Sequence, residues 1–196
     1  MALKWGFKTV ATSVARDVRE ELGLGPAAVF RPDALAAHLA IPIVPLSAFA
    51  KEIPAAVRYF RGRGSGEFSA GTIFADTQRL IIYNDAHAPA RQASDLAHEL
   101  SHALLFHEPK PALNDLGCRD WDEDAENEAD FLAGVLLVPD DVTIAVVRRG
   151  LSIEAAATEY SVSVALMRWR INVTGAHKRV SRARKAWSRT HKAARR

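Results

Sequence analysis

The stretch DLAHELSHALLFH, from Asp95 to His107, constrains the possible folds of this chain more than any other segment. It contains the pentapeptide HExxH, in which His98 and His102 stand at positions i and i+4. On an α-helix these positions lie about 40° apart, so both imidazoles share one face and can bind one Zn²⁺ ion. Glu99, rotated by about 100° from His98, can accept a proton from water held by the metal. The stretch predicts a helix from residue 89 or 90 to about 107.

An ordinary amphipathic helix is the alternative interpretation of this stretch. Its apolar face would consist of Leu96, Leu100, Ala103 and Leu104. HExxH arises by chance in roughly one chain of this length in a few hundred, so the pentapeptide alone does not decide between a zinc site and a core helix. A third zinc ligand elsewhere in the chain would favour the zinc site, because catalytic zinc usually takes three protein ligands and one water.

Glu126 is the candidate for this third ligand, 24 residues after His102. Asp130 follows at i+4 on the same helical face, where it can accept the free N–H of a ligand histidine and orient its ring. Glu128 is about 200° around the helix from Glu126 and is the weaker candidate. The alternative is a solvated acidic face at a helix N-terminus, where carboxylates are favourable in any case.

A third histidine can serve as the last ligand when it stands six residues after the second, but that position is Glu108 here. His107 is one residue short of it and about 140° around the helix from His102. We interpret His107 as a helix-end histidine or a loop contact. Tyr83, Arg91 and His107 are only nominal candidates for stabilising an oxyanion.

Periodicity, prolines and glycines predict the other elements. Helices are predicted over residues 7–22, 32–39, 125–138, 140–150, 152–159 and 163–172, and strands over residues 41–46, 56–61, 72–75 and 80–83. The last two strands are expected to form a hairpin through residues 76–79. Residues 61–71 and 108–124 are predicted to be loops. Cys118 in the second loop is interpreted as a bystander, the alternative being a thiol that reaches the zinc and blocks it.

Composition excludes several classes of protein. A single cysteine cannot form an internal disulfide, which favours a reducing compartment. The longest strongly apolar run, Phe131–Val138, is far shorter than the roughly 20 residues of a membrane helix. The first 23 residues contain no uninterrupted apolar segment typical of a signal peptide. We therefore expect a cytoplasmic protein without a membrane partner.

The positive charge of the chain is confined to its end. Residues 176–196 contain nine Lys or Arg residues and no acid, which leaves 17 basic and 23 acidic residues, about −6, in the rest of the chain. This basic tail is predicted to be disordered. It could alternatively become helical on an anion and attract nucleic acid or an acidic partner, with Trp187 stacking on a base.

The sequence resembles the ImmA/IrrE family of HExxH metallopeptidases. The resemblance rests on ASDLAHELSHALLFH (Ala93–His107) and ENEADFLAGVLLVP (Glu126–Pro139), and it extends over about residues 5–175. Ser101 stands where the family usually has glycine, and the order of residues around Phe131 also differs. Two motifs together are much more specific than either alone.

The resemblance implies an α+β, zincin-like metalloprotease domain, in which a small sheet lies beside the HExxH helix and a second helix that bears Glu126. It implies His98, His102 and Glu126 as Zn²⁺ ligands and Glu99 as general base. The strand over residues 80–83 would lie near the cleft and could pair with an extended substrate. We expect this domain over residues 1–140, a helix-turn-helix-like segment over 141–175 and the basic tail over 176–196.

Residues 151–172 have the helix–turn–helix shape that many family members share. Arg168 and Arg170 are expected on or near the outer face of its second helix, available to phosphates or a partner. The alternative is that these helices only pack on the protease domain.

Two functions follow from these observations. The first is a zinc endopeptidase that cleaves a helix-turn-helix transcriptional repressor, as family members often do. The second is a non-catalytic regulator that binds a repressor or DNA through residues 151–196 and keeps a structural or vestigial zinc site. The intact Glu99 argues against the second, because a structural site does not need it.

Overall fold

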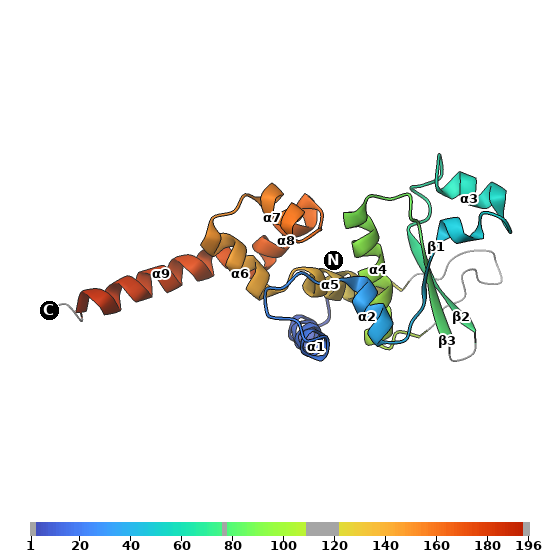
Figure 1. Cartoon of the computed structure of the whole chain (residues 1–196). Helices are drawn as coiled ribbons and strands as arrows, with labels where there is room; N and C mark the ends of the chain where they lie inside the picture. Colours follow the sequence, from blue (N-terminus) through green and yellow to red (C-terminus); the bar gives the residue numbers. More distant parts are fainter. Residues whose placement is uncertain (1–2, 76–77, 109–121, 194–196) are drawn as a thin grey trace.

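The computed structural model describes residues 3–75, 78–108 and 122–193 (Figure 1). It is an α+β fold, as predicted. Its strands are β1 (Ile43–Pro45), β2 (Ala70–Ala75) and β3 (Gln78–Tyr83). Its helices are α1 (Phe7–Glu21), α2 (Pro32–His38), the 3₁₀ helix η1 (Leu46–Phe49), α3 (Pro54–Phe60), α4 (Pro89–Leu104), α5 (Glu123–Leu137), α6 (Asp140–Arg149), α7 (Ile153–Glu159), α8 (Val164–Thr174) and α9 (Ala176–Ala193). Cys118 and most of the predicted loop 108–124 lie outside the described residues.

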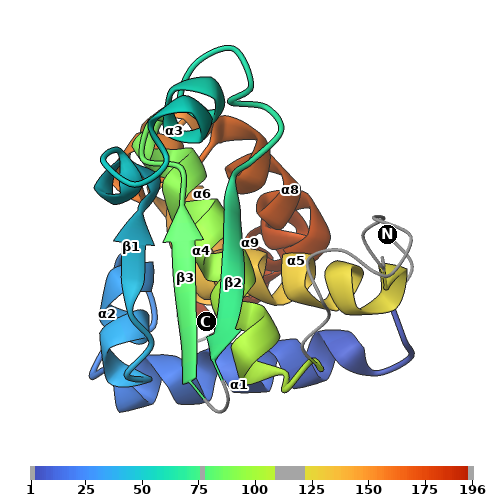
Figure 2. The same ribbon diagram turned by 90° about the vertical axis from the view of Figure 1, so that its right-hand side faces the viewer.

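The three strands form one small sheet in the order β1-β3-β2, seen face-on in Figure 2. β3 lies in the centre, parallel to β1 and antiparallel to β2, so the predicted hairpin of β2 and β3 is confirmed. α4 packs against β2 and β3 on one side and against α5 on the other. Ile81 of β3 is fully buried in the same core as Leu96 and Leu100 of α4. The HExxH helix is therefore enclosed between the sheet and α5.

α5 is the most deeply buried helix near α4. Every residue from Phe131 to Leu137 is buried, and α1 covers this helix through an edge-to-face contact between Phe7 and Phe131, with ring centroids 6.2 Å apart. Ala129 and Ala133 are also buried, and such small side chains allow neighbouring helices to approach closely. The chain therefore positions Glu126, at the more exposed start of α5, against the middle of α4.

The predicted strand over residues 56–61 is wrong, because this segment belongs to helix α3. Pro54 occupies the first turn of this helix, where its missing N–H costs nothing and its fixed φ suits the helix. The two alanines that follow are the strongest helix formers. The apparent alternation of polar and apolar residues was too short to outweigh these local signals.

Helices α7 and α8 lie where the sequence predicted them. Ser152 caps α7 by accepting a hydrogen bond from the Ala155 N–H at 3.1 Å, and Ser163 caps α8 by accepting one from the Leu166 N–H at 3.1 Å. Helix α8 packs against α5, α6, α7 and α9. Residues from both sides of position 140 share one hydrophobic core, and the domain boundaries at residues 140 and 175 stay predictions.

Arg170 is buried, which corrects the expectation that both arginines of α8 face outward. Its side chain is 2% exposed and its Nε donates to the Val138 carbonyl at 2.8 Å, while an Nη atom lies 3.2 Å from Asp140. Arg168 is exposed, as expected. The two residues differ because α8 packs one face against the end of α5, and Arg170 lies on that face.

The basic tail forms helix α9 over Ala176–Ala193, in place of the predicted disorder. Ala176 and Val180 are buried, and α9 packs against α6 and α8 at its start. Beyond this contact the helix extends away from the rest of the molecule (Figure 1). Within the described residues, no helix is both long enough and apolar enough to cross a membrane.

Candidate metal centre

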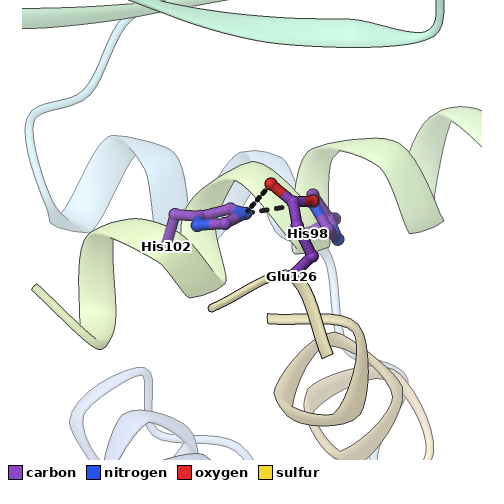
Figure 3. A group of neighbouring side chains, drawn as sticks. All are labelled: His98, His102 and Glu126. Atoms are coloured by element: carbon purple, nitrogen blue, oxygen red, sulfur yellow. Dashed lines mark hydrogen bonds and ion pairs between the residues drawn. The ribbon is translucent and has the colours of Figure 1, made fainter. Parts of the chain in front are cut away.

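His98, His102 and Glu126 come together as predicted, two from α4 and one from α5 (Figure 3). The Nε2 atoms of the two histidines are 3.0 Å apart. The Glu126 carboxylate oxygens lie 3.2 Å from His98 Nε2 and 3.8 Å from His102 Nε2. Ligands of a tetrahedral zinc ion with bonds of about 2.0–2.1 Å are separated by roughly 3.3 Å. The three side chains therefore have the spacing of a metal site.

The partners of the two imidazoles support a cation at this position. Asp130 lies 2.8 Å from His98 Nδ1, and a carboxylate accepts, so this nitrogen carries a proton. His107 Nδ1 lies 2.9 Å from His102 Nδ1. With both Nδ1 atoms engaged, the two Nε2 atoms face each other and Glu126. Two lone pairs at 3.0 Å repel, so a proton or a metal ion has to lie between them.

The pKa of His98 is consistent with this arrangement. Burial on its own lowers the pKa, but the hydrogen bond and charge of Asp130, together with the charges of Glu99 and Glu126, raise it above its ordinary value. In the absence of metal, His98 therefore holds its second proton more strongly than a free histidine. A metal ion has to displace that proton, so its apparent affinity for the site rises with pH.

Glu99 is outside the ligand group, as predicted for a general base. Its Oε2 accepts a hydrogen bond of 2.5 Å from the Thr72 hydroxyl on β2. This contact fixes the carboxylate beside the metal position and ties the sheet to α4. Sequence reasoning did not identify Thr72, because a lone threonine in a short strand carries no signal of its own and its partner is 27 residues away.

The strand that passes the site is β2, which corrects the expectation that residues 80–83 would pair with a substrate. β3 is hydrogen-bonded on both sides, to β1 and to β2. β2 pairs with β3 alone, so its outer edge has no strand partner within the described residues. The sequence showed two strands before α4 but not their order in the sheet, since that order depends on the pairing of β1.

The nominal oxyanion candidates have other contacts. Arg91 donates to the Ser69 hydroxyl at 2.8 Å and lies 3.8 Å from Asp95, while His107 contacts His102 and Glu128. Tyr83 is half-buried and packs against the core at the end of β3. None of the contacts of these three residues points to an oxyanion donor.

Glu128 lies outside the group of His98, His102 and Glu126, as expected of the weaker ligand candidate. It instead lies 3.4 Å from His107 Nε2 and 3.4 Å from Lys4 Nζ, with a side chain that is only 12% exposed. A small cavity of about 240 Å³ lies beside His98 and Asp130. It is lined by His98 and Asp130 and by Leu166 and Trp169 of α8. Helix α8 thus contributes one wall of this cavity.

An HExxH helix, a glutamate from a neighbouring helix and a small sheet whose edge strand β2 contacts the HExxH helix together define a metallopeptidase domain. Residues 55–172 match the family model Peptidase_M78, described as the IrrE N-terminal-like domain. The match includes more than half of the chain and all three ligand residues, and the protein belongs to this peptidase family. Among curated proteins, no match to this chain was found.

Proposed function

We propose that this protein is a zinc-dependent endopeptidase. The observation that carries the proposal is the triad of His98, His102 and Glu126, with Glu99 held next to it but outside it. Three protein ligands leave a fourth tetrahedral position for water or substrate, which is typical of catalytic rather than structural zinc. A purely structural site would have no use for an additional carboxylate fixed by Thr72.

The residues of the site divide the chemistry among them. A bound zinc ion would supply Lewis-acid polarisation of the scissile carbonyl and lower the pKa of a water molecule toward 7. Glu99 accepts the proton of the attacking water on a carboxylate oxygen and then delivers it to the departing amine. Thr72 limits the rotation of this carboxylate, and Asp130 holds the His98 ring with its Nε2 toward the metal position.

The outer edge of β2 is the part of the fold best suited to bind a peptide. Its outer N–H and C=O groups have no strand partner among residues 3–75, 78–108 and 122–193, and such groups can add an extended segment as a further strand. Thr72 belongs to this strand and contacts Glu99, so a peptide on the edge would pass close to the general base.

For the substrate we propose a helix-turn-helix transcriptional repressor. Its support is the resemblance to regulatory proteases of the ImmA/IrrE type. A repressor encoded next to this gene is the protein to test, incubated with the full-length enzyme with and without a chelator. We expect cleavage at a defined bond, its loss on chelation and its recovery on adding zinc, followed by intact-mass spectrometry.

Metal content provides the direct test of the site. Freshly purified protein is expected to contain about one zinc per chain by elemental mass spectrometry, and the His98→Ala/His102→Ala variant almost none. The His38→Ala variant is the control. His38 lies on α2 and pairs with Glu21 at the end of α1, so it belongs to neither of the helices that carry the triad. Wild-type protein without zinc, and without uptake on titration, would disprove the proposal.

A second candidate function, binding to DNA, is favoured by one observation. Helix α9 exposes Lys178, Arg182 and Lys185, the segment 176–196 has no acid, and Arg168 on α8 is exposed as well. Replacing these three residues of α9 by glutamine is expected to weaken DNA retention and to flatten its salt dependence. The same number of substitutions at Lys8, Lys51 and Arg58, also exposed, should have little effect. Equal retention by both triple variants, measured by fluorescence anisotropy over a salt series, would exclude α9 as the contact.

A further inference from the structure

Helix α4 ends in a turn that returns the chain over one of the proposed metal ligands. Leu105 caps the helix, and Phe106 adopts a left-handed conformation with φ of 53°. The Phe106 N–H donates to the Ala103 carbonyl at 3.3 Å and the His107 N–H to the His102 carbonyl at 3.1 Å. These two bonds define a Schellman motif, in which His102 and His107 are the two positions whose side chains normally meet.

The left-handed residue of this motif is usually glycine, because a Cβ is unfavourable there. Phe106 is 87% exposed, so burial of its ring does not offset that cost. The strained backbone of Phe106 is therefore retained although packing of its side chain does not stabilise it. What the turn does achieve is to place His107 against His102.

The side-chain contact at this turn is polar, whereas an apolar contact usually accompanies the motif. The Nδ1 atoms of His102 and His107 are 2.9 Å apart, and the ring centroids 4.9 Å. The other ring nitrogen of His107 lies 3.4 Å from Glu128 on α5. The side chains of His107 and Glu128 are 14% and 12% exposed, so water screens this pair little.

The direction of these hydrogen bonds follows from the carboxylate. Glu128 accepts, so Nε2 of His107 carries the proton and its Nδ1 has a free lone pair. His102 must then donate from its own Nδ1, which leaves its Nε2 unprotonated on the side of His98 and Glu126. This is the tautomer that a metal-binding histidine needs. Lys4, 3.4 Å from the other oxygen of Glu128, compensates the charge of the carboxylate.

We propose that His107, held by Glu128, is the positioning residue for the metal ligand His102. It does for His102 what Asp130 does for His98, with an imidazole inserted between the ligand and the carboxylate. The inference rests on the proposed metal site, and it assigns roles to two residues outside the triad. His107 orients the His102 ring and sets its tautomer without touching metal or substrate.

The test compares metal binding by His107→Ala, His107→Asn and the control His38→Ala in the full-length chain. The asparagine Oδ1 stands close to where His107 has Nδ1, so it can accept the same hydrogen bond. We expect His107→Ala to bind zinc about 10–100-fold more weakly in competition with a chromophoric chelator. Its cobalt-substituted form should show a changed d–d absorption spectrum, because the orientation of one ligand is no longer fixed. His107→Asn should recover most of the zinc affinity and most of the wild-type cobalt spectrum. His38→Ala should match the wild type in both measurements.

Glu128→Gln is a second variant. It keeps an oxygen that accepts a hydrogen bond from His107 but removes the negative charge of Glu128. A loss smaller than that of His107→Ala is expected. Zinc affinity of His107→Ala within about twofold of the wild type, with an unchanged cobalt spectrum, would overturn the inference and leave the proposed peptidase intact. A wild type that binds neither metal would overturn both.

Discussion

Replacing Glu99 by glutamine is expected to lower the rate of peptide cleavage by about 10²–10⁴-fold, the usual contribution of a general base. The side chain keeps its size, and its amide oxygen can still accept the hydrogen bond from Thr72. What disappears is the basic oxygen that takes the proton from water. Because Glu99 is outside the group of His98, His102 and Glu126, the zinc content should not change. Single-turnover cleavage and elemental mass spectrometry on the same preparation measure both quantities.

Two further variants show whether the loss is specific to the base. Glu123→Gln removes an exposed carboxylate from the first turn of α5 and should leave cleavage unchanged. Thr72→Val keeps the carboxylate of Glu99 but removes its hydrogen-bond donor, so we expect an intermediate loss that appears in kcat. Cleavage by Glu99→Gln at the wild-type rate would remove Glu99 from the role of base.

Replacing Asp140 by alanine is expected to reduce the free energy of unfolding by about 2–4 kcal/mol. Asp140 is the anionic partner of Arg170, whose guanidinium is buried between Phe131 and Trp169, 5.7 and 5.4 Å from their ring centres. Burial lowers the pKa of Arg170, and the charge of Asp140 opposes this effect. Without Asp140 the buried cation keeps the Val138 carbonyl and the two aromatic rings but loses its anionic partner, and an unpaired buried charge is costly. Because Asp140 is 35% exposed, we expect a loss near the lower end of the roughly 3–5 kcal/mol typical of breaking a buried ion pair.

Two substitutions of neighbouring charged residues distinguish the loss of the Asp140–Arg170 pair from a general effect of removing a charge. Asp141→Ala removes an exposed carboxylate from the same helical turn and should cost less than about 1 kcal/mol, through the helix dipole and its electrostatic attraction to Arg19. Arg179→Ala removes the other cation that pairs with Asp140, a side chain that is 48% exposed, and should also cost little. Urea unfolding of the three variants would contradict the expectation if their losses were equal.

The local features of the site were predictable because they depend on helical geometry. His98 and His102 face the same way wherever an HExxH segment is helical, and Glu126 and Asp130 share a face for the same reason. The serine caps of α7 and α8 also follow from nearest neighbours in the chain. The strand wrongly predicted over residues 56–61 is the exception. There a short alternation of polar and apolar residues suggested a strand, whereas Pro54 marks the start of a helix.

The contacts between elements were not predictable in the same way. The sequence contained Thr72, Glu128 and Arg170, but nothing local distinguishes them from other polar residues. Thr72 became part of the site because β2 lies beside α4, and Arg170 became buried because α8 packs on the end of α5. His107 is an intermediate case. A Schellman turn would have placed it over His102, but its left-handed residue is a phenylalanine, so the usual glycine signal is missing.

The sequence by itself predicted the HExxH helix, the two histidines and the second-helix glutamate proposed as ligands, and Glu99 as the proposed general base. These depend on angles within single helices, which the covalent chain and its hydrogen bonds dictate. Only the tertiary structure decided that the edge strand β2 contacts α4, that Asp130 contacts His98 rather than His102, and that His107 contacts both His102 and Glu128. Those contacts depend on how the sheet, α4 and α5 pack together, and packing combines many weak interactions that no single segment encodes.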